Sequence, residues 1–75
     1  MLAIHIYAIN PKQTNPVEGF TLYPTEPNFM RKKHKLERDI NSGDWENWPG
    51  EKRRYFVRRC KDNGWTIKIK TCMIN

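Results

Sequence analysis

The segment WTIKIKTCMI, at positions 65–74, alternates between two kinds of side chain along most of its length. One set of alternate positions is mostly apolar, and the other contains Lys68 and Lys70. Successive side chains of a β-strand point to opposite faces, so this period of two predicts a strand with one buried face and one solvent-exposed face. Such a strand needs partner strands beside it and a second layer over its apolar face.

Two segments near the N-terminus have the pattern of partner strands. Residues 2–9, LAIHIYAI, alternate in the same way and include three isoleucines, which favour strands. Residues 19–23, GFTLY, place Phe20 and Leu22 on the inward face. Residues 10–19 between them contain two prolines and two asparagines, as a loop does. These features predict that the two strands pair antiparallel.

The middle of the chain predicts two amphipathic helices. Thr25 or Asn28 can cap the start of the first helix, and Gly43 stops it. A second helix is expected over about residues 50–62, because an Asn-Gly pair follows that can end a helix in the left-handed conformation.

The resulting order of elements is ββααβ, in one domain that covers residues 1–75. We expect an α+β fold with a three-stranded, largely antiparallel sheet and two helices packed on one face. A chain of 75 residues has room for only one thin core. Trp45 and Trp48, in the joint between the helices, are expected to close one end of that core.

The charge of the chain is concentrated in its second part. Residues 31–75 contain 13 of the 14 Lys and Arg and six of the eight Asp and Glu, a net charge of +7, which leaves −1 for residues 1–30. A basic excess on one part of a chain favours a polyanionic partner, such as a nucleic acid. An ordinary solubility charge is the simpler alternative.

Each predicted helix carries three cations opposite its apolar side. Like charges three and four residues apart repel by roughly 0.2–0.5 kcal/mol per pair, so stability alone does not favour this arrangement. Arginine can hold a phosphate through two hydrogen bonds. The rows therefore predict phosphate contacts to DNA or RNA. Their members are Arg31, Lys35 and Arg38 on the first helix and Arg54, Arg58 and Lys61 on the second.

The uncovered face of the sheet is a second candidate surface. Aromatic rings beside lysines suit single-stranded nucleic acid, since bases stack on the rings while lysines meet the backbone. An ordinary strand face, in which tyrosine and threonine are scaffold residues, is the simpler alternative. The side chains expected on this face are His5, Tyr7, Thr21, Tyr23, Lys68 and Lys70, of which the tyrosines and lysines are the candidate contacts.

A protein partner is the alternative to a nucleic acid. The same cations would attract an acidic protein, as in an inhibitor, an antitoxin or a phage accessory protein. Trp45 and Trp48 could anchor such an interface, although tryptophans at this spacing also suit a core lid. An edge strand that pairs between two copies would make a homodimer.

The sequence predicts neither an enzyme nor a cofactor. His5, His34, Cys60 and Cys72 lack the spacing of metal ligands, and no activated nucleophile is apparent. A small ribonuclease that uses His5, Tyr23 and a lysine is chemically possible but has no local support. No apolar run is long enough to span a membrane, and with both cysteines free we expect a cytoplasmic protein.

Overall fold

Three strands and two helices make up the fold, with a short 3-10 helix between the two helices. The computed structural model describes residues 2–23 and 28–73, so Thr25 and the end of the last predicted strand lie outside the described residues. The order of elements confirms the predicted α+β fold. The elements are β1 (Leu2–Ile9), β2 (Val17–Leu22), α1 (Phe29–Ser42), η1 (Asp44–Asn47), α2 (Glu51–Asn63) and β3 (Thr66–Met73).

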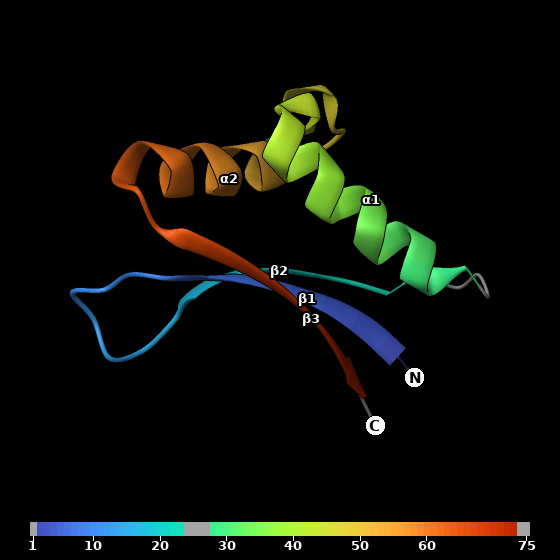
Figure 1. Ribbon diagram of the computed structural model, residues 1–75, viewed down its shortest axis with the longest axis horizontal. Coiled ribbons are helices and arrows are strands. Elements are labelled where there is room, and N and C mark those ends of the chain that lie inside the picture. Colours follow the sequence, from blue (N-terminus) through green and yellow to red (C-terminus); the bar gives the residue numbers. More distant parts are fainter. Residues whose placement is uncertain (1, 24–27, 74–75) are drawn as a thin grey trace.

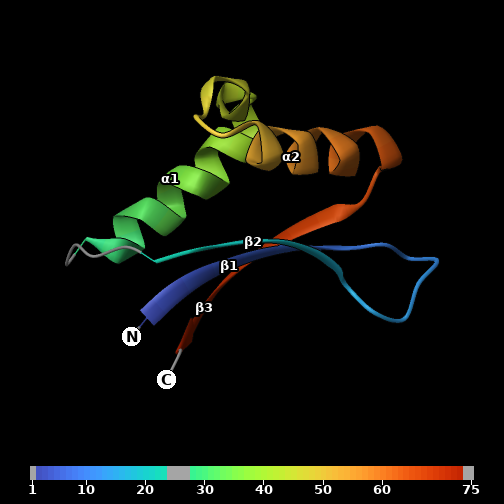
Figure 2. The ribbon, with the colours of Figure 1, turned by 180° about the vertical axis from the view of Figure 1, so that it is seen from behind.

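The sheet is antiparallel and has the order β2-β1-β3, so the first strand is the central one. Ile6 of β1 pairs with Phe20 on one side and with Ile69 on the other, which brings apolar residues of all three strands onto one face. Strand β2 begins at Val17, two residues before the predicted start, because Val17 pairs with Ala8 of β1. Both helices lie on the same side of this sheet, and no described element covers its other side (Figures 1 and 2).

The core lies between the helices and the covered face of the sheet. Its fully buried members are Ile4, Ile6 and Ala8 of β1 together with Val57 and Cys60 of α2. Trp45 and Trp48 are also part of this cluster, so the joint between the helices contributes two large side chains to the core.

The Phe56 ring packs directly over Gly19 of β2. A Cβ atom on Gly19 would lie 2.7 Å from two carbons of that ring and would also collide with the carbonyl oxygen of Ile6. The pairing of β1 with β2 shifts register beside this glycine, between Ile6 and Tyr7. The absence of a side chain at Gly19 therefore lets Phe56 of α2 pack closely on the sheet.

The helices end as the sequence predicts, and α1 begins directly after Asn28, one of the two predicted cap residues. Gly43 and Gly64 follow α1 and α2 with φ angles of 93° and 70°, in the left-handed region that glycine adopts at low cost. Asn28 precedes α1, yet its side chain makes no capping hydrogen bond, so the expected cap is absent at this residue.

Candidate anion-binding surface on helix α2

Helix α2 carries six cationic side chains that have no carboxylate partner among the described residues. Among residues 2–23 and 28–73, none of the ion pairs within 4.0 Å includes a Lys or Arg of this helix. Five of the six are exposed, and Arg54 is half-buried. Unpaired like charges on one helix repel each other, and a bound anion would relieve that repulsion. The six residues are Lys52, Arg53, Arg54, Arg58, Arg59 and Lys61.

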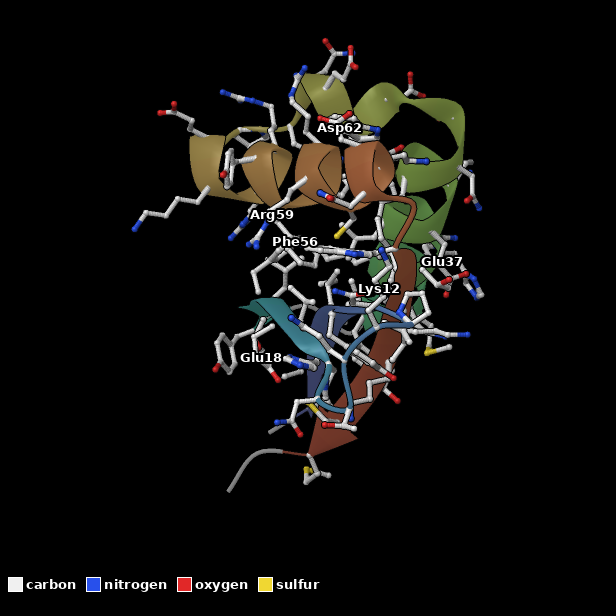
Figure 3. The ribbon with its side chains drawn as sticks, turned by 90° about the vertical axis from the view of Figure 1, so that its left-hand side faces the viewer. Lys12, Glu18, Glu37, Phe56, Arg59 and Asp62 are labelled. Carbon is white, nitrogen blue, oxygen red and sulfur yellow. The ribbon has the colours of Figure 1, made fainter. Side chains whose placement is uncertain are left out.

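Three of these arginines lie over aromatic rings. A guanidinium held over a ring by a cation–π contact has five N–H donors, and some of them can still meet an anion. Figure 3 shows the Arg59 side chain on the sheet side of α2 and Asp62 on the opposite side. The stacked pairs are Arg53 with Phe20 at 5.5 Å, Arg58 with Trp45 at 5.5 Å and Arg59 with Trp65 at 5.0 Å, each measured to the ring centroid.

A shallow depression of about 470 Å³ lies on the outer side of α2. Lys52, Arg54 and Arg58 line it together with Glu51 and Tyr55. The Tyr55 side chain is 65% exposed, so its ring is available to a ligand. Tyr55 was not among the predicted contacts, although its place between arginines in the sequence was a usable signal. We call the four residues Lys52, Arg54, Tyr55 and Arg58 the α2 surface.

The predicted row Arg54, Arg58 and Lys61 is only partly directed at solvent. Arg54 donates a hydrogen bond to the backbone carbonyl oxygen of Trp48, which fixes its side chain over the joint. Lys61 is exposed and lines a small depression beside Asn41 of α1. The row thus includes one arginine with a structural role.

The predicted row on α1 does not consist of three unpaired cations. Lys35 Nζ lies 2.6 Å from Asp39 Oδ2, one helical turn away. Arg31 and Arg38 are exposed and form no ion pair with any described residue. Compensation of Lys35 leaves α1 with a weaker cationic face than α2.

Asp39 is a buried acid that the sequence patterns did not predict as a site residue. Its side chain is 8% exposed, and its Oδ2 atom also accepts a hydrogen bond of 2.8 Å from Trp48 Nε1. The hydrogen bonds from Lys35 and Trp48 hold the pKa of the Asp39 carboxyl below its ordinary value, because they stabilise the charged form. The spacing of four residues between Lys35 and Asp39 was a signal for the first bond, whereas the bond to Trp48 depends on the tertiary fold.

The uncovered face of the sheet brings together five of the six predicted side chains. Thr21 Oγ1 and Glu18 Oε2 lie 3.0 and 3.2 Å from the two ring nitrogens of His5. The His5 ring stacks on Tyr7 with centroids 5.6 Å apart, and Lys70 Nζ lies 5.2 Å from the Tyr7 centroid.

These contacts leave the residues of this face largely occupied. Both ring nitrogens of His5 have a partner on this face, Thr21 and Glu18. The Tyr7 ring is in contact with both His5 and Lys70. Lys68 is exposed on the same face, and Tyr23 lies just beyond the end of β2, with 54% of its surface exposed. The face therefore offers fewer open contacts than the α2 surface.

Trp45 and Trp48 offer little surface to a partner protein. Their exposed fractions are 5% and 9%, because both rings pack in the core. Both side chains would have to leave the core before they could anchor an interface. Their burial instead fits the simpler prediction that they are core residues. The alternative of an acidic protein partner therefore depends on the cations alone.

Other kinds of site receive no support from the described residues. They contain no group of three or more His, Cys, Asp or Glu placed to hold a metal ion. Of the helices in the described part of the chain, none has the length and apolar character to cross a membrane. Burial raises the pKa of the Cys60 thiol to about 11, so it is not an activated nucleophile. No known protein family, curated protein or solved structure matches this chain.

Proposed function

We propose that this protein binds the phosphate backbone of a nucleic acid, DNA or RNA, through the α2 surface. The observation that carries the proposal is the set of six Lys and Arg on α2 that form no ion pair with any described residue. Phosphates are the anions that occur at regular spacing in a polymer, so they can satisfy several such cations at once. We further propose that it acts in the cytoplasm, where Cys60 and Cys72 remain thiols.

The contacts of the arginines support phosphate binding in particular. Arg58 is held by the Trp45 ring and Arg54 by the Trp48 carbonyl group, so both lose little side-chain freedom when they bind. Their remaining N–H groups can meet phosphate oxygens in pairs. The exposed Tyr55 ring between them can contact a sugar or a base. Arg31 and Arg38 on α1 and Lys61 on α2 are exposed as well and add positive charge that attracts a polyanion.

An acidic protein is the alternative partner for the same cations. Its carboxylates would pair with these cations, and it would add apolar contacts that salt does not screen. The edge strands β2 and β3 also allow pairing between two copies, which would make a homodimer. Neither alternative has an exposed tryptophan to anchor it.

Fluorescence anisotropy with labelled duplex DNA, single-stranded DNA and RNA tests the proposal. We expect affinity to fall steeply between about 50 and 200 mM salt. Binding releases counterions from the phosphates, and this release becomes less favourable as the salt concentration rises. The variant Arg58→Gln should bind more weakly, and the slope of log K against log salt should fall by about 0.7–0.9 for one lost phosphate contact. Arg58→Lys should regain part of the slope, since it restores charge without the fork.

The control is Lys12→Gln, which makes the same change in charge in the loop between β1 and β2. It should leave both affinity and slope near those of the parent protein. Absence of binding to all three nucleic acids at low salt would overturn the proposal. An equal loss in the Lys12 and Arg58 variants would show that net charge alone attracts the ligand and would refute a role for the α2 surface.

A further inference from the structure

A second cleft, more apolar than the depression on α2, lies between α1, β2 and the segment that leads into α2. Its volume is about 340 Å³, within the range of small-molecule sites. Arg53, Lys32 and Lys35 bring positive charge to it, and Asp39 also lines it. The apolar walls are made by Phe20, Leu22, Leu36, Trp48 and Pro49.

Asp39 gives this cleft an unusual hydrogen-bond acceptor. The bonds from Lys35 Nζ and Trp48 Nε1 both end on Oδ2, and no described residue donates to Oδ1. Asp39 lines the cleft, so Oδ1 is the oxygen of this carboxylate that a donor on a ligand would use. A carboxylate oxygen between apolar walls is a strong acceptor for a ligand N–H group.

We propose that this cleft binds a single guanine base of the nucleic acid that contacts the α2 surface. The inference rests on the proposed function, which concerns phosphate contacts, and adds a binding site for one base. A base is flat and largely apolar on its faces, which suits walls of Leu, Phe, Trp and Pro. Arg53 lies over Phe20 at the wall of the cleft and on the first turn of α2, so one strand can reach the cleft and the α2 surface together.

The carboxylate favours guanine over the other bases. The pairing edge of guanine places two N–H donors side by side, at N1 and N2, with no acceptor between them. In adenine, cytosine and uracil, each N–H donor on this edge has an acceptor next to it, which would repel the carboxylate.

Binding of short oligouridines tests the inference without any change to the protein. One central uridine is replaced in turn by guanosine, adenosine or cytidine, and the affinities are compared at one salt concentration. Since the phosphates are the same, differences between the oligonucleotides report the base alone. We expect guanosine to bind at least about tenfold more tightly than uridine, as one hydrogen bond to a charged group predicts. Equal affinities for all four would overturn the inference and leave the proposed function intact.

The variant Asp39→Asn should abolish the preference for guanosine and retain binding to oligouridine. The control Glu37→Gln removes a carboxylate from the same helix, on the side that faces β3, and should keep the preference. Circular dichroism establishes that both variants fold. If Asp39→Asn does not fold, the comparison of oligonucleotides on the parent protein decides the matter by itself. A preference for guanosine that survives in a folded Asp39→Asn variant would refute the role of Asp39.

The Trp48 indole N–H resonance reports the cleft independently of the α2 surface, because this group donates to Asp39. We expect guanosine monophosphate to shift it and uridine monophosphate to leave it in place, whether or not oligonucleotides bind to α2. A resonance that moves with a short acidic peptide but with neither nucleotide would overturn the nucleobase assignment. Loss of oligonucleotide binding with this shift retained would count against the α2 surface alone.

Discussion

Replacement of Gly19 by Ala provides a direct test of the packing between α2 and the sheet. The added Cβ would lie 2.7 Å from two carbons of the Phe56 ring and would collide with the carbonyl oxygen of Ile6. Neither neighbour can move easily. Ile6 belongs to the central strand, and the Phe56 ring is 8% exposed and packs edge-on against Phe20 at 6.0 Å. The structure must therefore shift to accept one methyl group.

The expected cost follows from two opposing effects. Overpacking of a tight core costs about 1–3 kcal/mol, and the rigid neighbours of Gly19 place this site in the upper part of that range. Replacement of glycine also reduces the freedom of the unfolded chain, which returns about 0.4–1 kcal/mol. We expect a net loss of about 2 kcal/mol in the free energy of unfolding. For a domain of this size, that loss lowers Tm by roughly 8–16 °C.

Urea denaturation of Gly19→Ala, Phe56→Leu and the double variant measures this effect. The smaller leucine side chain should relieve part of the collision, so the two changes should be less than additive by about 0.5 kcal/mol or more. Gly43→Ala is the control, because nothing lies within 4 Å of its Cβ and its cost arises from its φ of 93° alone. It should add independently to Phe56→Leu. A Gly19→Ala protein as stable as the parent would refute the packing argument.

Two further predictions concern buried titratable groups. The pKa of Asp39 is lowered by Lys35 and Trp48, so its contribution to stability should be complete above its unfolded value near 3.8 and lost as pH falls through the lower folded value. Acid denaturation should therefore depend less steeply on pH in Asp39→Asn. The pKa of Cys60 is raised from 9.0 to about 11 by burial, so the folded protein should lose stability as pH rises through that interval. At pH 8 a thiol reagent should label Cys72 in the folded protein but Cys60 only after unfolding, and early labelling of Cys60 would contradict its burial.

Local patterns in the sequence were sufficient to predict the elements and their layers. The alternation around Lys68 and Lys70 determined a strand, because strand side chains point to opposite faces whatever the partner. Gly43 and Gly64 ended the helices where predicted, because their left-handed conformation is a local property. Each of these features depends on residues only a few positions apart.

The details of the candidate sites depended on contacts between distant residues. No local pattern connects Asp39 with the Trp48 indole, and helical periodicity alone did not predict that Arg58 would stack on Trp45 or that Arg54 would bind the Trp48 backbone. The start of β2 two residues early likewise reflects its pairing with β1. Charge patterning located the cations along the chain, but only the packing of α2 against η1 and the sheet decided which of its arginines are held by an aromatic ring or a carbonyl group. Those contacts are tertiary because they act over a few ångströms in space, which Arg58 and Trp45 reach only when the helices pack together.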